Sequence, residues 1–99
     1  MPYALIRQAI LQRRSLSAEY EGLQRRFSPH ALGRNRAGSP AVVVFQYAGA
    51  APAGLPLAGD WACFQLDGLR NLTVNDDVWL AGPIAGRPSG WLESIDVSV

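Results

Sequence analysis

The side chains that could carry chemistry in this chain are arginines gathered near its amino terminus. Seven of the nine arginines lie within the first 36 residues, against two acids, Glu19 and Glu21, so this segment carries a net charge of +5. The rest of the chain has two arginines and six acids, a net charge of −4. A cationic end on a small protein predicts an anionic partner. The seven residues are Arg7, Arg13, Arg14, Arg25, Arg26, Arg34 and Arg36.

The candidate ligand-binding residues combine some of these arginines with polar and aromatic groups. Aromatic rings interleaved with arginines are typical of proteins that bind single-stranded nucleic acid, where each stacked base contributes about 1–3 kcal/mol. The single histidine, His30, follows Pro29, which constrains its orientation. We predict that the guanidinium groups gather over one hollow between a helix and a sheet. The predicted site residues are Arg13, Tyr20, Arg26, His30, Arg34, Gln46 and Trp61.

The same residues also have structural interpretations, which the sequence leaves open. His30 could be a turn histidine bonded to the backbone, and the aromatic rings could belong to the core. Arg25 and Arg26 point to opposite sides of one strand, so one is expected in solvent. The other is expected to pair with Glu19 or Glu21 across a hairpin.

Motifs and composition exclude most enzyme chemistry. One histidine and one cysteine, Cys63, cannot supply the four ligands of a structural zinc site. The chain has no lysine, so it has no Walker loop. Cys63 lies in an apolar strand, as expected for a buried, inert thiol, and a serine–histidine–carboxylate set built on His30 lacks a nucleophile elbow. We therefore expect a non-enzymatic protein with no metal and no cofactor.

Length and composition indicate one cytoplasmic domain spanning residues 1–99. The chain has 99 residues and a hydrophobic fraction of 48%, an ordinary value for one globular core. A lone cysteine allows no internal disulfide, which favours the reducing cytosol. Arg7 interrupts the first apolar run, so the start does not resemble a signal peptide. No run approaches the roughly 18 apolar residues of a membrane span, so no membrane partner is expected.

The hydrophobic pattern predicts a helix over residues 2–14, where Tyr3, Ile6 and Ile10 share one stripe at helical spacing. A β-region over 16–97 is expected to follow.

Two alternating segments that follow the helix predict a β-hairpin. Residues 16–21 and 23–28 alternate apolar and polar side chains about a tight turn at Glu21 and Gly22. Pro29 is expected to end the second strand or to place it at a sheet edge. A turn is expected over 33–38.

The later segments predict further strands. Residues 41–48 are β-branched and aromatic, which indicates a central strand covered on both faces. An 11-residue loop at 49–59 is long enough to be functional or mobile, and 60–67 is the next strand. Weaker strand candidates are 69–74, 78–81 and 91–97, with a turn at 76–77 and a loop at 82–90. The fold class is therefore mainly β: an N-terminal helix followed by a small five- to six-stranded twisted sheet or barrel.

Two segments of the chain resemble the motifs of a WYL domain. Residues 26–32, Arg-Phe-Ser-Pro-His-Ala-Leu, match the family pattern R-x-x-P-x-x-L after a helix and a strand carrying Tyr20. Residues 64–69 resemble its second motif, F-R-L-D-R-I, with Gly68 in place of the second arginine. Valines stand where the family has Trp-Tyr-Leu, so the chain resembles a divergent, stand-alone member over roughly residues 5–74.

The resemblance implies a fold and a function. It implies an Sm-like barrel preceded by a helix, which binds a nucleotide or single-stranded nucleic acid and regulates transcription or defence. The alternative is a protein-interaction or homo-oligomerisation module of a bacterial regulatory system with no small ligand. In that case the cationic end of one chain would meet the acidic end of another chain or of a regulator protein, with the apolar tail 78–97 at the contact.

Overall fold

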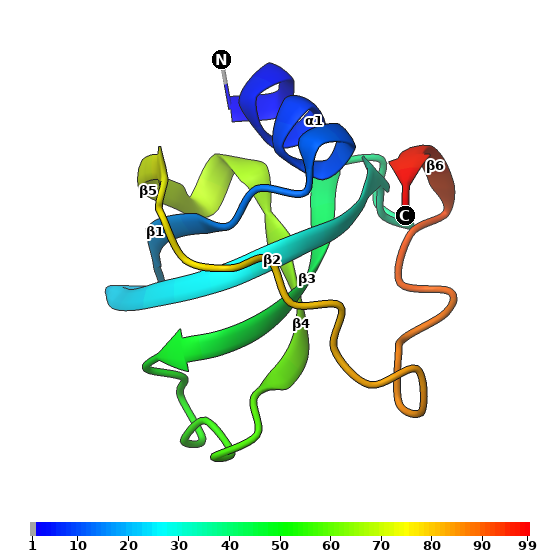
Figure 1. The fold of residues 1–99 in the computed structure, drawn as a ribbon. Helices are drawn as coiled ribbons and strands as arrows, with labels where there is room; N and C mark the ends of the chain where they lie inside the picture. The colour runs from blue at the N-terminus through cyan, green and yellow to red at the C-terminus, as the bar shows by residue number, and fades with distance from the viewer. Residues whose placement is uncertain (1) are drawn as a thin grey trace.

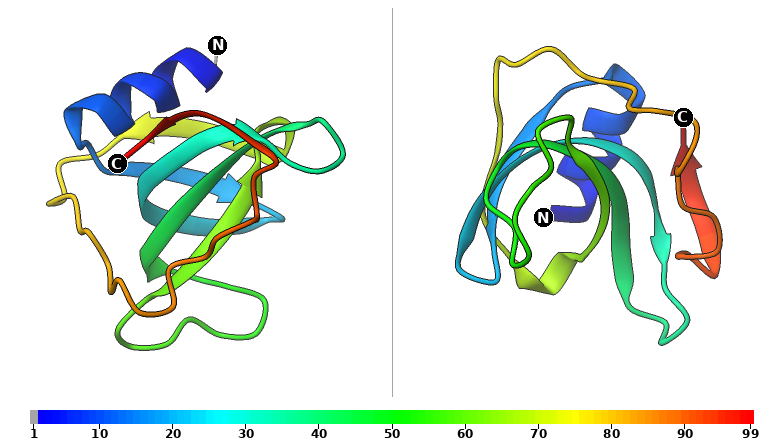
Figure 2. Two further views of the ribbon diagram at one scale, coloured as in Figure 1. Left: turned by 90° about the vertical axis from the view of Figure 1, so that its right-hand side faces the viewer. Right: turned by 90° about the horizontal axis from the view of Figure 1, so that it is seen from below.

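A computed structural model, which describes residues 2–99, contains one helix and one antiparallel sheet of six strands (Figure 1). The strand order is β4-β3-β2-β1-β5, and β6 pairs with the far end of β2. Along this path no pairing joins β4 to β5 within the described residues, so the twisted sheet stays open (Figure 2). The mainly β prediction is confirmed. The elements are α1 (Pro2–Gln12), β1 (Leu16–Tyr20), β2 (Leu23–Arg34), β3 (Pro40–Gly49), β4 (Asp60–Gln65), a 3₁₀ turn (Leu66–Gly68), β5 (Leu69–Val74) and β6 (Ser94–Ser98).

Helix α1 is two residues shorter than predicted because Arg13 adopts a left-handed conformation with φ of 50°. The Arg14 N–H donates to the Ala9 carbonyl at 2.8 Å, and the Arg13 N–H donates to the Ile10 carbonyl at 3.2 Å. These two bonds form a Schellman motif, which satisfies carbonyls at the helix end. The apolar stripe around Ile6 and Ile10 is buried, as predicted.

The β1–β2 hairpin forms as predicted, with Tyr20 paired to Leu23 across a two-residue turn. Both turn residues have positive φ, 54° at Glu21 and 76° at Gly22. This is the arrangement of a type I′ turn, whose twist matches the flanking strands.

The prediction that Pro29 ends its strand or lies at an edge is wrong. Strand β2 continues to Arg34 and is bonded to β1, β3 and β6. Pro29 pairs with Val44, and the register shifts before Ala31. On the other side of β2, β1 pairs only as far as Phe27 and β6 begins only at Ala31, so Pro29 lies in a gap between two partner strands, where a residue without an N–H is tolerated. The predicted turn at 33–38 accordingly begins only after Arg34.

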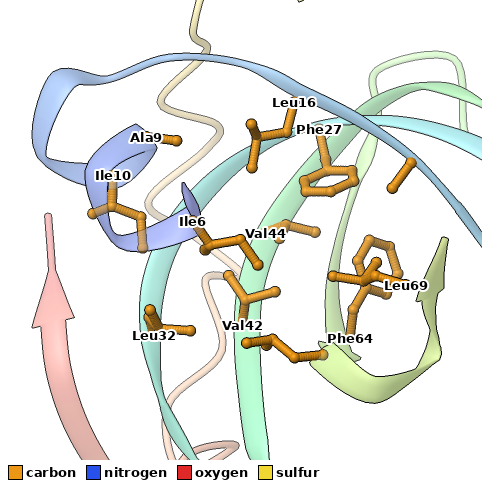
Figure 3. Packing of buried hydrophobic residues seen from close by; sticks show 12 residues of the cluster. Ile6, Ala9, Ile10, Leu16, Phe27, Leu32, Val42, Val44, Phe64 and Leu69 are labelled. Atoms are coloured by element: carbon orange, nitrogen blue, oxygen red, sulfur yellow. The ribbon is translucent and has the colours of Figure 1, made fainter. Parts of the chain in front are cut away.

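Strand β3 is covered on both faces, as predicted. Val42 and Val44 enter the main core between the helix and the sheet (Figure 3). Val43 and Phe45 point to the other face, where they form a smaller cluster with Ala31 and Trp61. The main core comprises Ile6, Ala9, Ile10, Leu16, Ala18, Phe27, Leu32, Val42, Val44, Phe64, Leu66 and Leu69.

Residues 75–93 form an irregular segment, here called the strap, which runs beside the sheet (orange in Figure 2). The predicted strand at 78–81 is wrong, because the main-chain groups of Leu80 and Ala81 bond to side chains of β2 instead of a neighbouring strand. The Leu80 N–H, for example, donates to the Ser28 Oγ at 2.8 Å. The predicted strand at 91–97 is realised only as β6, and the one at 60–67 ends at Gln65.

Candidate functional site

The structure places the predicted cations apart from one another, so the prediction of a shared hollow between helix and sheet is wrong. Arg26 is 58% exposed and lies 3.4 Å from the Asp77 carboxylate. Arg34 lies at the β2–β3 hairpin and donates to the Gly38 carbonyl at 2.8 Å. Acids and carbonyls distributed over the surface pair with these arginines individually, so the positive charge of the sequence segment does not become one patch.

Three predicted residues, Arg13, His30 and Trp61, lie on the outer face of the sheet. The His30 ring is 1% exposed and lies between two indoles, stacked on Trp79 at 4.5 Å and edge-on to Trp61 at 4.9 Å. The Arg13 guanidinium lies 5.9 Å from the centre of the Trp79 ring, and Arg87 lies 5.8 Å from that of Trp61. Cations and rings therefore alternate in one stack.

Both His30 nitrogens face backbone carbonyls, and the neutral ring, which has one N–H, donates to one of them at a time. Nδ1 lies 2.8 Å from the Ser28 carbonyl, and Nε2 lies 2.8 Å from the Ala81 carbonyl of the strap. Burial lowers the pKa of His30 below its ordinary value, against the opposing effect of the two carbonyls. Trp79 adds a bond from Nε1 to the Pro29 carbonyl at 3.1 Å. The geometry matches the structural interpretation of His30, although this residue lies in a strand and not in a turn. His30 and Trp79 together hold the strap against β2.

The remaining predicted residues, Tyr20 and Gln46, meet around Arg25 at the opposite end of the sheet. Arg25 and Gln46 continue the inward-facing rows of β2 and β3, beyond Phe27 and Val44. They line a cavity of about 250 Å³, here called the Arg25 cavity. Its other lining residues are Ala51, Pro52, Ala53, Gly54, Leu55, Pro56, Asp60, Trp61 and Ala62.

Arg25 is a buried cation whose side chain is 4% exposed. Its Nη2 donates to the Tyr20 carbonyl at 3.1 Å and lies 3.5 Å from the Glu21 carboxylate. Its Nη1 donates to the Gln46 Oε1 at 3.4 Å. The guanidinium carbon lies 5.6 Å from the centre of the Tyr20 ring and 5.3 Å from that of Phe64. The expected pairing of one arginine with Glu19 or Glu21 is confirmed for Arg25, and Arg26 is the exposed one.

Two buried side-chain donors have no protein acceptor, and one of them belongs to Arg25. Within residues 2–99, the buried side-chain nitrogens and oxygens without a hydrogen-bond partner are Arg25 Nε and Trp61 Nε1. The Trp61 ring packs against His30 and Phe45 on the outer face of the sheet, whereas Arg25 extends from the inner face and lines the Arg25 cavity. A buried donor without an acceptor costs about 1–3 kcal/mol, so the fold retains an unsatisfied N–H in a residue that lines this cavity.

The loop at 50–59 covers this cavity and is fastened at its two ends (bright green in Figure 1). The Gln46 amide donates to the carbonyls of Ala48 and Ala50 at 3.1 and 2.9 Å. At the other end Gly59 has a φ of 88° and lies so close to β3 that a Cβ would be 2.7 Å from Phe45 Cζ. Between these ends Leu57 is fully exposed.

Arg25 is the residue that sequence reasoning undervalued. Arg26, which stands in the R-x-x-P-x-x-L segment, is among the predicted site residues, and Arg25 is not. The signal for Arg25 was its alternation with Leu23 and Phe27, which places it on the apolar face of β2. An arginine on a core-facing row is costly to bury and therefore informative.

Cys63 is half-buried, and burial raises the pKa of its thiol, which disfavours the reactive thiolate. Among residues 2–99 no three His, Cys, Asp or Glu side chains come together in a way that could hold a metal ion. The described helix is too short to cross a membrane.

Comparisons with protein-family models, with curated protein sequences and with solved structures found no match for this chain.

Proposed function

We propose that the protein is a non-enzymatic binding module that holds a nucleotide unit, free or at the end of a single strand, in the Arg25 cavity. The observation that carries this proposal is the buried Arg25 guanidinium, whose Nε lacks an acceptor beside a cavity of about 250 Å³. Phosphate oxygens and nucleobase edges both supply an acceptor of the kind that Arg25 Nε lacks.

The size and lining of the cavity support a small ligand. Small-molecule sites are mostly apolar with a few placed polar groups, and drug-sized ligands occupy about 300–1,000 Å³. The Arg25 cavity is smaller, and alanine, proline and leucine side chains form much of its wall. It suits one nucleobase or one phosphate group, with the rest of the ligand outside.

The topology supports the proposal that this is a divergent WYL-like domain on an Sm-like sheet. A helix precedes the strands, the order is β4-β3-β2-β1-β5, and a 3₁₀ turn leads into β5. Both motif segments contribute to one region, because Phe64 of the second motif lies against Arg25, next to the first. A regulatory role in the cytoplasm follows from that resemblance.

The test is binding of adenosine 5′-monophosphate by calorimetry, and of labelled single-stranded DNA and RNA by anisotropy. Arg25→Met should lower affinity at least about tenfold, because it removes a charged hydrogen-bond donor. The unfolding free energy should change by no more than about 1 kcal/mol, since an apolar side chain of similar size often replaces a buried ion without loss. The matched control, Arg26→Gln, removes the neighbouring exposed charge and should bind normally.

A comparison of the affinities for these ligands also shows whether the nucleotide unit is free or part of a strand. Equal affinities for the mononucleotide and the oligonucleotides indicate a free nucleotide, whereas clearly tighter oligonucleotide binding indicates a strand. With one buried cation, a fourfold rise in salt should weaken strand binding only about threefold per phosphate contact. If the folded protein binds none of these ligands at low salt, the proposal is wrong.

A second candidate function is protein interaction or self-association, favoured by apolar side chains exposed on the strap and on β6. Light scattering over a range of protein and salt concentrations tests it. A monomer under all conditions contradicts self-association. The exposed residues are Val78, Leu80, Ile84, Trp91 and Ile95.

A further inference from the structure

The Arg25 guanidinium is reached from a second side by Glu21. The Glu21 Oε1 lies 3.5 Å from Arg25 Nη2, and the Glu21 side chain is 64% exposed. Glu21 lines a separate hollow of about 340 Å³ beside the β1–β2 turn, here called the turn-side hollow. Arg25 therefore lines the Arg25 cavity on one side. On another side it lies beside the carboxylate of Glu21, a residue of the turn-side hollow.

The position of Glu21 in the turn is unusual. It occupies the first of the two turn residues with a φ of 54°. Asparagine, aspartate and glycine are the residues that favour positive φ in type I′ turns. The residue preferences of type I′ turns therefore do not explain a glutamate at this position, whereas the contact of its carboxylate with Arg25 does. A backbone conformation that disfavours its residue often marks a functional position.

We propose that Glu21 is a built-in competitor for the ligand: it neutralises Arg25 in the empty protein and gives way when an anionic group enters the Arg25 cavity. This inference rests on the proposed function and adds the control of ligand affinity to it. A buried guanidinium needs a nearby negative charge. The Glu21 carboxylate is itself largely exposed and makes its contact at 3.5 Å, so it regains water when an entering anion takes over the charge balance of Arg25.

The surroundings of Glu21 allow it to leave. Arg70 lines the same turn-side hollow, so a released carboxylate stays near a cation. Arg70 itself is held in place by bonds from Nη1 to the carbonyls of Asp67 and Leu69, at 2.8 and 3.2 Å. The other acid of this hollow, Glu19, forms no ion pair with Arg25. Glu19 and Glu21 thus carry equal charge in one hollow but differ in their contact with Arg25.

That difference provides the test, with adenosine 5′-monophosphate and inorganic phosphate as probes. Glu21→Gln should tighten binding of both roughly two- to fivefold, the range expected from removing an exposed competing charge. The matched control, Glu19→Gln, makes the same charge change in the same hollow and should leave affinity nearly unaltered at physiological salt, where distant charges are screened. Glu21→Asn also removes the charge, and asparagine favours the conformation of this turn. It should tighten binding as Glu21→Gln does, and it controls for any loss of the hairpin in that variant.

A second measurement follows the Arg25 Nε–H directly by nitrogen–proton NMR. Phosphate should shift this resonance in the wild type, and at lower concentrations in Glu21→Gln. If the wild type binds but Glu21→Gln and Glu21→Asn bind no better than Glu19→Gln, the competitor role is wrong and the proposed function stands. If no folded variant binds and the resonance never moves, both proposals are wrong.

Discussion

Two basic side chains of β2, His30 and Arg25, are both buried among aromatic rings, yet they differ in how fully their nitrogens are bonded. Both His30 nitrogens lie 2.8 Å from carbonyl oxygens. The Arg25 contacts are longer, at 3.1–3.5 Å, and its Nε has no acceptor. The surroundings of His30 are thus supplied by the fold itself, whereas Arg25 keeps a donor without an acceptor and lines a cavity, and the proposed binding rests on that difference.

The segments that cover the two sites differ in the same way. The first part of the strap is bonded to the sheet, since Asn75 Nδ2 donates to the Ser17 Oγ at 2.8 Å and Tyr47 donates to the Asp77 carboxylate at 2.7 Å. The loop at 50–59 is bonded to the sheet at its Ala50 end, whereas the Gly59 N–H donates to the Pro56 carbonyl inside the loop. We therefore propose that the loop, and not the strap, moves to admit a ligand.

The largest effect expected is that of His30→Ala on stability. The substitution removes a ring packed between two indoles and its bonds to the Ser28 and Ala81 carbonyls. The unfolding free energy should fall by about 2–4 kcal/mol in urea denaturation. Affinity for adenosine 5′-monophosphate should stay within about twofold, because distant sites act independently. A loss of binding without a loss of stability would reverse the roles assigned to His30 and Arg25.

Gly59→Ala should have the next largest effect, because it acts on the fastened end of the loop. A Cβ there would lie 2.7 Å from Phe45 Cζ and 2.8 Å from the Gln46 carbonyl, at a φ of 88°. The expected loss of stability is about 1–3 kcal/mol, with weaker ligand binding. Gly54→Ala is the control: its φ is 84°, but nothing lies within 4 Å. Equal losses in the two variants would show that the loop end is not held by contact.

A smaller effect is expected from pH. Burial lowers the pKa of His30 in the folded protein below the ordinary 6.5. The unfolded chain therefore takes up this proton first as pH falls. The stability linked to His30 is complete above about pH 6.5 and declines as pH falls toward the folded pKa. Urea denaturation at about pH 7.5 and about pH 5.5 should show a larger decline for the wild type than for His30→Ala. Equal declines would contradict a neutral, buried His30.

The smallest effect expected is that of Arg26→Gln. This exposed arginine pairs with Asp77 at 3.4 Å, so its loss should cost less than about 1 kcal/mol in urea denaturation. Ligand affinity should remain that of the wild type. Weaker binding in this variant would move the site from the Arg25 cavity to the surface of β2.

The sequence predicted well the elements that local chemistry determines. Glu21-Gly22 defined the hairpin turn, and the β-branched run of 41–48 defined the central strand. The prediction for Pro29 failed, because the place of this residue in β2 depends on its partner strands, which no local pattern reveals. The strap at 75–93 has no period, since its bonds go to groups distant in sequence. The same distance explains the surroundings of Arg25: Arg25, Gln46 and Phe64 come from three strands, and only the pairing of these strands brings them together.

The absence of a side chain at Gly33 also has a consequence for how the chain reaches its native state. A Cβ there would lie 1.9 Å from the Ser94 carbonyl, so this glycine allows β6 to dock on β2. The partners in this pairing are some sixty residues apart along the chain, and contacts between such distant segments form slowly. During synthesis, the carboxyl-terminal end of β2 therefore completes its pairing only after the distant β6 segment has been made.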